Sequence, residues 1–217
     1  MKNIKNLTEN SISVFKEQAK LIMYLFIMLV LNIPINGQKT DLAQFEYLKQ
    51  PQISFKKDQK MIVVESKGDP NIVGGKAFGL LFQLYYSSPK TPKGSIQLFP
   101  CARWPESLNA PKSEWIGLYA LPVPDSMVIL PNYNPQEGIK ASLTVWEYGE
   151  VAEILHLGPY IREDSTINRL REFVKREGYV IIGGHEEEYI VGPTIGSKGD
   201  PEKYVTIIRY RVKKINK

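Results

Sequence analysis

The sequence predicts an α+β fold, in which two similar modules of strand, helix, strand and strand build an antiparallel sheet. The chain has 217 residues, of which 43% are hydrophobic and 24% are charged, so it can bury a core. Short β-branched segments alternate with two stretches of helical periodicity. Because this order of elements occurs twice, we expect a pseudo-twofold axis with a ligand cleft between the two halves.

The first module is expected over residues 61–124. Its first strand is rich in Ile and Val and ends at Gly68, and the apolar residues that follow recur at helical spacing until about Tyr86. In the last strand, Trp115 and Tyr119 fall on one face because side chains alternate along a strand. The expected elements are strands over 61–66, 95–99 and 115–121 and a helix over 73–86.

The second module is expected over residues 141–212. Gly149 separates two apolar segments that we expect to pair as a hairpin. Asp164 or Ser165 can cap the helix that follows, and Gly178 suits its left-handed end. The expected elements are strands over 143–148, 150–157, 179–190 and 204–212, with the helix between the second and third of these.

The N-terminal segment has the three parts of a secretory signal peptide: a region with lysines, an apolar run over 21–31, and a break that ends in the small residue Gly37. The run is shorter than the roughly 20 residues that a membrane-spanning helix needs. We therefore expect cleavage after Gly37 and export to the periplasm or the exterior. An uncleaved membrane anchor, associated with the membrane through 21–38, and a buried core helix are the alternatives. The expected division is a signal peptide or anchor over 1–37, a linker over 38–60 and a domain over 61–217.

Composition excludes several kinds of site. Cys101 is the only cysteine, so no disulfide within the chain and no cysteine-rich zinc site can form. His156 and His185 could bind haem iron or zinc, but without the spacing of a metal site a structural role is expected for both. We therefore expect no metal and no cofactor.

The charge of the chain does not indicate a nucleic-acid partner. The formal net charge is +5, and part of the basic excess lies before Gly37. A late basic run over 209–217 is interrupted by Tyr210, Val212 and Ile215, and no motif that reads nucleic acid accompanies it. We expect no nucleic-acid partner, and the oligomeric state is left open.

Two short motifs of the second module carry a resemblance to a known family. A Gly-Pro-Tyr motif at 158–160 follows a strand, and a Glu-x-Tyr motif at 187–189 lies in the next hairpin. With the flanking segments 151–157 and 206–208, these motifs resemble the GyrI-like family of small-molecule-binding domains. That family includes the effector-binding domains of multidrug-sensing transcription activators and is related to the haem-binding SOUL proteins. The resemblance covers about 61–212 in architecture, and we expect no DNA-binding helical unit ahead of it.

The resemblance implies that Glu187 lies in the ligand cleft among aromatic side chains, with Tyr189 beside it. Strand alternation is compatible with this placement, because His185, Glu187 and Tyr189 share one face of their strand. An error of one residue in the register would turn Glu186 and Glu188 inward instead. The ordinary alternative for this acidic run is a solvated hairpin edge.

The same residues suggest the chemistry of the ligand. A carboxylate buried among aromatic rings is costly unless a cation or a hydrogen bond compensates it, and aromatic faces attract cations by about 0.5–2 kcal/mol. The expected ligand is therefore hydrophobic and cationic. Ordinary core packing is the alternative role for the aromatic residues. The candidate ligand-binding residues are Glu187, Tyr189, Trp115, Tyr119, Trp146, Tyr148 and Tyr160.

The predicted function is that of an exported protein that holds a small hydrophobic, cationic molecule without altering it. The alternative is a hydrolase of reactive electrophiles, because some GyrI-like proteins hydrolyse such molecules in the same cleft. Glu187 would then act as general base on water, and Tyr189 or another tyrosine would donate a proton to the leaving group. Haem binding of the SOUL kind is a third hypothesis, based on fold analogy alone.

Overall fold

The computed structural model describes residues 40–94, 97–104, 111–134, 137–193, 197 and 199–215. All of them belong to one unit, Thr40–Lys217. The expected signal peptide or anchor over 1–37 and the expected membrane association through 21–38 lie outside the described residues. Within the described part, the helices are too short or too polar to cross a membrane.

The first module consists of β2 (Gln59–Lys67), α2 (Pro70–Ser87), β3 (Cys101–Trp104) and β4 (Ile116–Pro122). Asp69 caps α2 by accepting a hydrogen bond from the backbone N–H of Asn71 at 2.9 Å, and Pro70 occupies the first turn, where its missing N–H costs nothing. The strand expected over 95–99 is wrong, since 97–100 form no strand and β3 follows them. β3 pairs with β4 on one side and β8 on the other, so tertiary pairing overrides the local propensity.

The second module consists of β6 (Gly149–Leu157), α3 (Glu163–Arg176), β7 (Tyr179–Ile181), β8 (His185–Val191) and β9 (Val205–Lys214). α3 begins earlier than expected, at Glu163, and Arg162 occupies the N-cap position without a side-chain hydrogen bond. Neither Asp164 nor Ser165 is therefore the cap. The strand expected over 179–190 is two strands, because β7 pairs with the end of β9 and β8 pairs with its first half.

The two edge strands are exchanged between the modules. The segment expected as a linker contains the 3-10 helix η1 (Leu42–Lys49) and the strand β1 (Gln52–Lys56), and β1 leads into β2 but pairs with β6. In the same way β5 (Ile139–Trp146) leads into β6 but pairs with β2. The hairpin expected around Gly149 is thus wrong: the residues between β5 and β6 carry the chain from one half of the sheet to the other.

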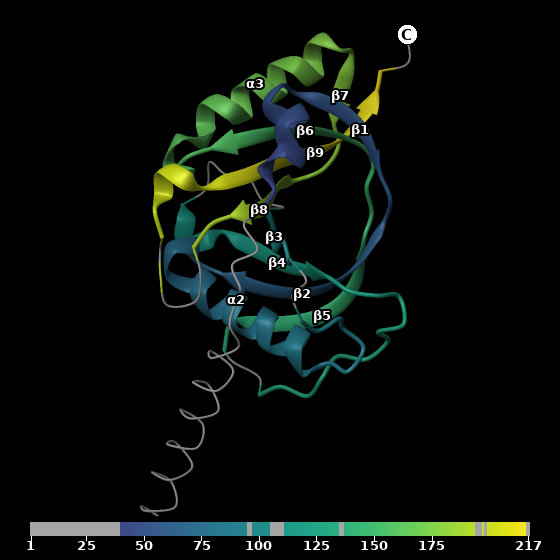
Figure 1. Cartoon of the computed structure of the whole chain (residues 1–217), viewed down its shortest axis with the longest axis vertical. Coiled ribbons are helices and arrows are strands. Elements are labelled where there is room, and N and C mark those ends of the chain that lie inside the picture. The colour runs from purple at the N-terminus through teal and green to yellow at the C-terminus, as the bar shows by residue number, and fades with distance from the viewer. Residues whose placement is uncertain are drawn as a thin grey trace, which may run out of the picture. The chain divides into compact units, whose positions relative to one another are not determined.

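The strands form one sheet in the order β1-β6-β9-β8-β3-β4-β2-β5, with β7 paired to β9 (Figure 1). β3 and β8 pair at its centre, and β3-β4-β2 on one side corresponds to β8-β9-β6 on the other. The predicted α+β fold with duplicated modules and a pseudo-twofold axis is confirmed. Three further 3-10 helices are η2 (Lys112–Glu114), η3 (Tyr160–Arg162) and η4 (Pro201–Lys203).

Both α-helices pack on the same face of the sheet, which we call the helical face. α2 lies on β2 and β4, and α3 lies on β6 and β7, each over its own buried apolar cluster. On the other side, which we call the opposite face, η1 packs against β6. Residues that are directly paired on neighbouring strands share a face of the sheet. On the helical face, one row of such partners runs across six strands: Ile154, Ile208, Glu187, Ala102, Tyr119 and Val64.

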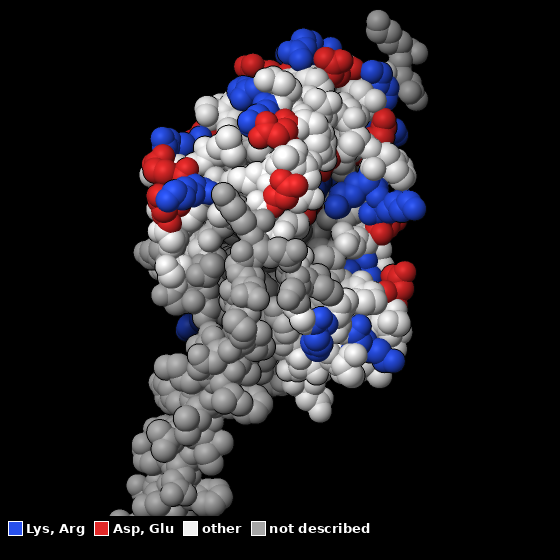
Figure 2. All heavy atoms as spheres, viewed as in Figure 1, with Lys and Arg blue, Asp and Glu red and all other residues white. Residues whose placement is uncertain are grey.

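Exposed charges are mixed in sign. Figure 2 shows Lys and Arg side chains beside Asp and Glu side chains over much of the described part of the face in view. Arg176, for example, lies 3.3 Å from Glu177, with side chains that are 70% and 44% exposed. Because such exposed pairs contribute about 0–1 kcal/mol, the charges that bear on function are the buried ones.

Candidate ligand-binding site

The centre of the helical face carries the predicted glutamate. Glu187 projects from β8 between the parts of the sheet that α2 and α3 cover, and its direct neighbours across the ladder are Ala102 and Ile208. The predicted alternation is confirmed, because His185 and Tyr189 lie beside it on this face. The side chain of Glu187 keeps 12% of its area exposed, so it is largely shielded from solvent.

Three donors within the protein hold the Glu187 carboxylate. The Tyr189 hydroxyl donates to it at 2.6 Å, His185 Nε2 lies 2.9 Å away, and Trp104 makes a third hydrogen bond. Burial opposes ionisation of Glu187, but the hydrogen bonds and the charge of His185 outweigh it and lower the pKa. The site therefore contains a buried carboxylate in its ionised form.

A chain of hydrogen bonds fixes the orientation of His185. An ionised carboxylate only accepts, so Nε2 must carry the ring proton that it donates to Glu187. Nδ1 lies 2.9 Å from the Tyr210 hydroxyl, and the oxygen of that hydroxyl accepts from Arg171 at 3.2 Å. Residues of α3, β9 and β8 thus hold Glu187 in place.

A second carboxyl group, missed by the sequence analysis, points into the same site. Glu163 is the first residue of α3 and is 6% exposed, and its Oε1 has no hydrogen-bond partner. One ligating atom each of Glu163, His185 and Glu187 lies within 4.8 Å of the others. Burial, the charge of Glu187 and the charge of Asp164 raise the pKa of Glu163 to about 9.

This spacing would also suit a metal ion, since a histidine nitrogen and carboxylate oxygens are common metal ligands. The sequence signal for Glu163 was its place beside the predicted helix start. The caps expected from the sequence, Asp164 and Ser165, lie two and three residues after the actual cap Arg162, so Glu163 was placed before the helix.

Two hydroxyl groups on the helical face are also unpaired. Tyr119 Oη and Thr206 Oγ1 are buried and have no hydrogen-bond partner. Thr206 lies between His156 and Tyr189 in the ladder, and burial followed by the charge of Glu187 raises the pKa of Tyr119 to about 12. Among the described residues, the buried side-chain polar atoms without a partner all lie on the helical face. Each such atom costs about 1–3 kcal/mol while it stays unpaired.

Aromatic rings surround these polar groups. Tyr160 lies 5.7 Å from Tyr189 between ring centroids, and Trp104 lies 5.8 Å from Tyr119. Gly117 permits this approach, since a Cβ there would come within 2.8 Å of Tyr119 and 2.9 Å of Trp104. The structure therefore brings the predicted Tyr119, Tyr160 and Tyr189 together around Glu187. Phe78 and Trp104 belong to the same group of rings, although the sequence did not predict them. The predicted Trp115 contacts Trp104.

The other two predicted aromatic residues lie on the opposite face. The guanidinium carbon of Arg103 is 3.9 Å from the ring centroid of Trp146 and 4.8 Å from that of Tyr148. Tyr148 also donates to Glu186 at 3.1 Å. These two rings do surround a cation, but it is an arginine of the chain itself, so they are not brought together with Glu187.

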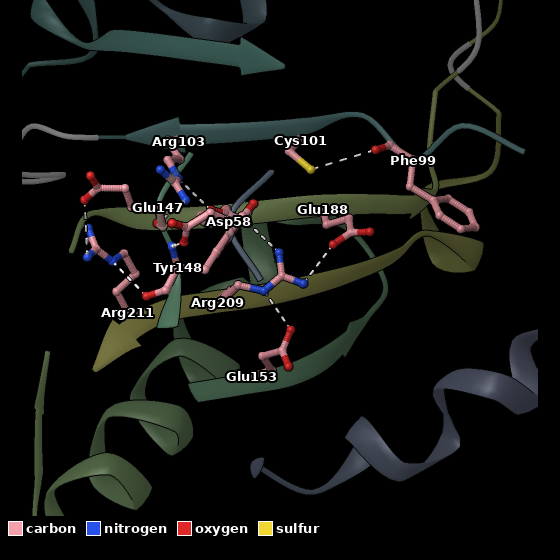
Figure 3. Close-up of polar contacts among 11 residues, drawn as sticks. Asp58, Phe99, Cys101, Arg103, Glu147, Tyr148, Glu153, Glu188, Arg209 and Arg211 are labelled. Atoms are coloured by element: carbon pink, nitrogen blue, oxygen red, sulfur yellow. Dashed lines mark hydrogen bonds and ion pairs between the residues drawn. The ribbon is translucent and has the colours of Figure 1, made fainter. Parts of the chain in front are cut away.

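The rest of the opposite face is a closed network of charges (Figure 3). Arg209 is 3% exposed and contacts Glu153 at 2.7 Å and Glu188 at 2.8 Å, and it also contacts Glu186. Arg103 binds the other oxygen of Glu186 at 2.6 Å. The acidic run is therefore not a solvated edge on either face.

His156 supports the Gly-Pro-Tyr turn. Its Nε2 lies 3.3 Å from the carbonyl oxygen of Pro159, and its Nδ1 lies 3.0 Å from Thr166 Oγ1 on α3. Because a carbonyl only accepts, Nε2 carries the proton. Both ring nitrogens are thus used to fix the turn before α3, which positions Tyr160 and Glu163.

Comparisons with known proteins identify the fold. No protein-family model and no curated protein matches the chain. Among solved structures, an uncharacterized conserved protein from Listeria innocua is 22% identical, with a TM-score of 0.61 over 81% of this chain and 100% of that one. A chain described as a hydrolase from Listeria innocua is 21% identical, with a TM-score of 0.59 over 81% and 100%. The EcmrR C-terminal domain is 15% identical, with a TM-score of 0.57 over 77% and 99%.

At these identities the likeness shows the fold alone. The chain shares the fold of the EcmrR C-terminal domain, and its resemblance to the GyrI-like family rests on the sequence motifs described above. Membership of that family stays a prediction.

One expectation about partners is wrong. EcmrR also matches in its complex with DNA, at 14% identity and a TM-score of 0.52 over 93% of this chain and 72% of that one. A protein that contains this fold is thus found in a complex with DNA, and the charge pattern of the fold itself does not reveal what a larger assembly contacts. Nucleic acid is therefore no longer excluded as a partner of this chain.

Proposed function

We propose that the chain binds a small hydrophobic cation on the helical face, beside Glu187. One observation carries the proposal: an ionised carboxylate, two unpaired hydroxyls and an unpaired carboxyl oxygen lie buried within one aromatic surround. A buried polar atom without a hydrogen-bond partner destabilises the folded state unless a ligand provides that partner. Their arrangement therefore supports binding rather than packing.

The sign of the ligand follows from the charges. Among the described residues, the ion pairs with Lys or Arg do not include Glu187 or Glu163, whereas every buried carboxylate of the opposite-face network has such a partner. For Glu187, the ring of His185 at 2.9 Å is the cationic partner within the protein, if it is protonated, so a ligand that brings a positive charge would add a second one. The faces of Tyr119, Tyr160 and Trp104 would add about 0.5–2 kcal/mol for each close contact with it.

Matched ligands test the proposal. We expect the ammonium form of 2-naphthylmethylamine to bind more tightly than uncharged 2-naphthylmethanol, as measured by isothermal titration calorimetry. The variant Glu187→Gln should weaken the amine about tenfold or more, because a charge-assisted contact contributes about 1.5–3 kcal/mol. Glu188→Gln is the control, since that side chain faces Arg209 on the other side of the sheet. Equal binding of the amine and the alcohol would overturn the proposal.

Hydrolysis of a reactive electrophile is the second candidate. The unpaired Tyr119 hydroxyl beside Glu187 favours it, because it could donate to a leaving group. Against it, the lowered pKa makes Glu187 a weak base, and the Tyr189 hydroxyl is already occupied by Glu187. Turnover of a panel of epoxides and strained rings by the parent, lost in Glu187→Gln, would favour the enzyme over the binder.

Export stays a separate proposal, supported by the apolar run over 21–31 and the small residue Gly37. N-terminal sequencing of the protein recovered from outside the cytoplasm should begin at Gln38. A mature chain that starts at Met1 and remains in the membrane would favour the anchor instead.

A further inference from the structure

The two carboxyl groups of the site differ in what they can still accept. Glu187 already receives hydrogen bonds from Tyr189, His185 and Trp104, so most of its acceptor capacity is used. Its negative charge can attract a cationic ligand, but it can accept few further hydrogen bonds. Glu163 Oε1 is buried and receives none.

The two groups are close enough to act on one ligand atom. Their nearest ligating atoms lie within 4.8 Å of each other. A nitrogen that donates to Glu163 at the usual 2.7–2.9 Å or so of a charge-assisted bond would therefore also lie beside Glu187. The unpaired oxygen accepts a hydrogen bond whether the Glu163 carboxyl is ionised or neutral.

We propose that the ligand is a cation that carries at least one N–H, such as a protonated amine or an amidinium, and that it donates this N–H to Glu163 while its charge lies beside Glu187. The inference rests on the proposed binding function and narrows it to one class of cation. A quaternary ammonium group can contact the aromatic rings and the Glu187 charge, but it has no hydrogen to give. It would leave Glu163 Oε1 buried and unpaired.

Two ligands that differ by one methyl group test this. N,N-dimethyl-2-naphthylmethylamine, protonated at neutral pH, has one N–H, and its N,N,N-trimethyl analogue has none. Titration calorimetry on the unaltered protein should show the tertiary amine binding about tenfold or more tightly than the quaternary ion. Because this comparison needs no variant, it holds even if a substitution at Glu163 prevents folding.

Substitutions then assign the preference to Glu163. Glu163→Met fills the same buried space without an acceptor, and the preference for the tertiary amine should fall to less than about twofold. The control is Asp164→Asn, which removes a charge from the same helical turn at an exposed position. That variant should keep the preference of the parent.

The outcomes separate this inference from the proposed function. Equal affinity for the two cations, or a preference that Glu163→Met leaves unchanged, overturns the inference but leaves cation binding intact. If neither cation binds while the protein is folded, cation binding itself fails and the inference fails with it.

Discussion

Three consecutive glutamates of β8 meet two different environments. Glu186 and Glu188 face the opposite side of the sheet, where Arg103 and Arg209 pair with them. Glu187 faces the helices, where only neutral donors and a histidine hold it. The same residue type is thus paired with arginine on one face, whereas on the other it has no Lys or Arg partner among the described residues.

The difference is visible in the pairing register. On the opposite face, the directly paired residues Glu153, Arg209, Glu186 and Arg103 alternate in sign across four strands. The corresponding row on the helical face places Glu187 between Ile208 and Ala102. A network in which each charge has its partner stabilises the sheet only while it is complete. Glu187 lies outside that network, on the face that the helices cover.

Removing the shared cation should have the largest effect on the opposite face. We expect Arg209→Met to lower the free energy of unfolding by about 3–5 kcal/mol, because three carboxylates would remain buried without their partner. Urea denaturation followed by circular dichroism measures this. A loss of less than about 1 kcal/mol would show that the network contributes little.

On the helical face, the corresponding effect should depend on pH. The raised pKa of Glu163, about 9 against 4.5 for the free side chain, means that between these values the folded state holds a proton that the unfolded state has released. The free energy of unfolding should therefore fall as pH rises from 5 to 8, by at most about 1.4 kcal/mol per pH unit.

In Glu163→Gln this contribution should disappear, while Asp164→Asn should keep it. His156, whose pKa is lowered by burial, titrates in both proteins, so the difference between the parent and Glu163→Gln isolates Glu163. Parallel curves of stability against pH for these two proteins would contradict the assignment.

One substitution made on both faces should give opposite results. Tyr148→Phe removes a hydroxyl that donates to Glu186 at 3.1 Å, and we expect a loss of about 1.5–3 kcal/mol in the free energy of unfolding. Tyr119→Phe removes a buried hydroxyl that has no partner, so stability should stay the same or rise by about 1 kcal/mol. Equal losses in the two variants would remove the distinction between the faces.

The smallest effect is expected at the rim of the charged network. Glu147 lies 3.9 Å from Arg211, and their side chains are 72% and 32% exposed. Glu147→Gln should change the free energy of unfolding by less than about 0.5 kcal/mol. A larger loss would mean that the network extends beyond its buried members.

Local patterns predicted the modules well and their pairing poorly. The order of strands and helices, the face of Glu187 and the alternation along β4 follow from periodicities of two and 3.6 residues, which the sequence displays directly. The hairpin at Gly149 and the strand over 95–99 failed because strand pairing is decided between segments far apart in the chain.

The sequence predicted the site residues whose position follows from the alternation of side chains along a strand. It missed those whose position depends on where a helix begins or on the register of the sheet. Glu163 enters the site because α3 begins one residue before the expected cap. Trp104 enters it because β3 pairs with β8 in a register that opposes Trp104 and His185. Trp146 and Tyr148 were grouped with Glu187 because aromatic residues alone do not reveal which face they occupy.

The exchanged edge strands make each half of the sheet depend on the other. A break in the backbone between β4 and β5 would give one fragment with β1 to β4 and another with β5 to β9, and each would hold the outermost strand of its counterpart. Two such fragments, produced separately, should therefore reassemble into the intact sheet. The architecture suits a split-protein reporter, in which reunion of the halves rebuilds β3 beside β8 and, with them, the site of Glu187.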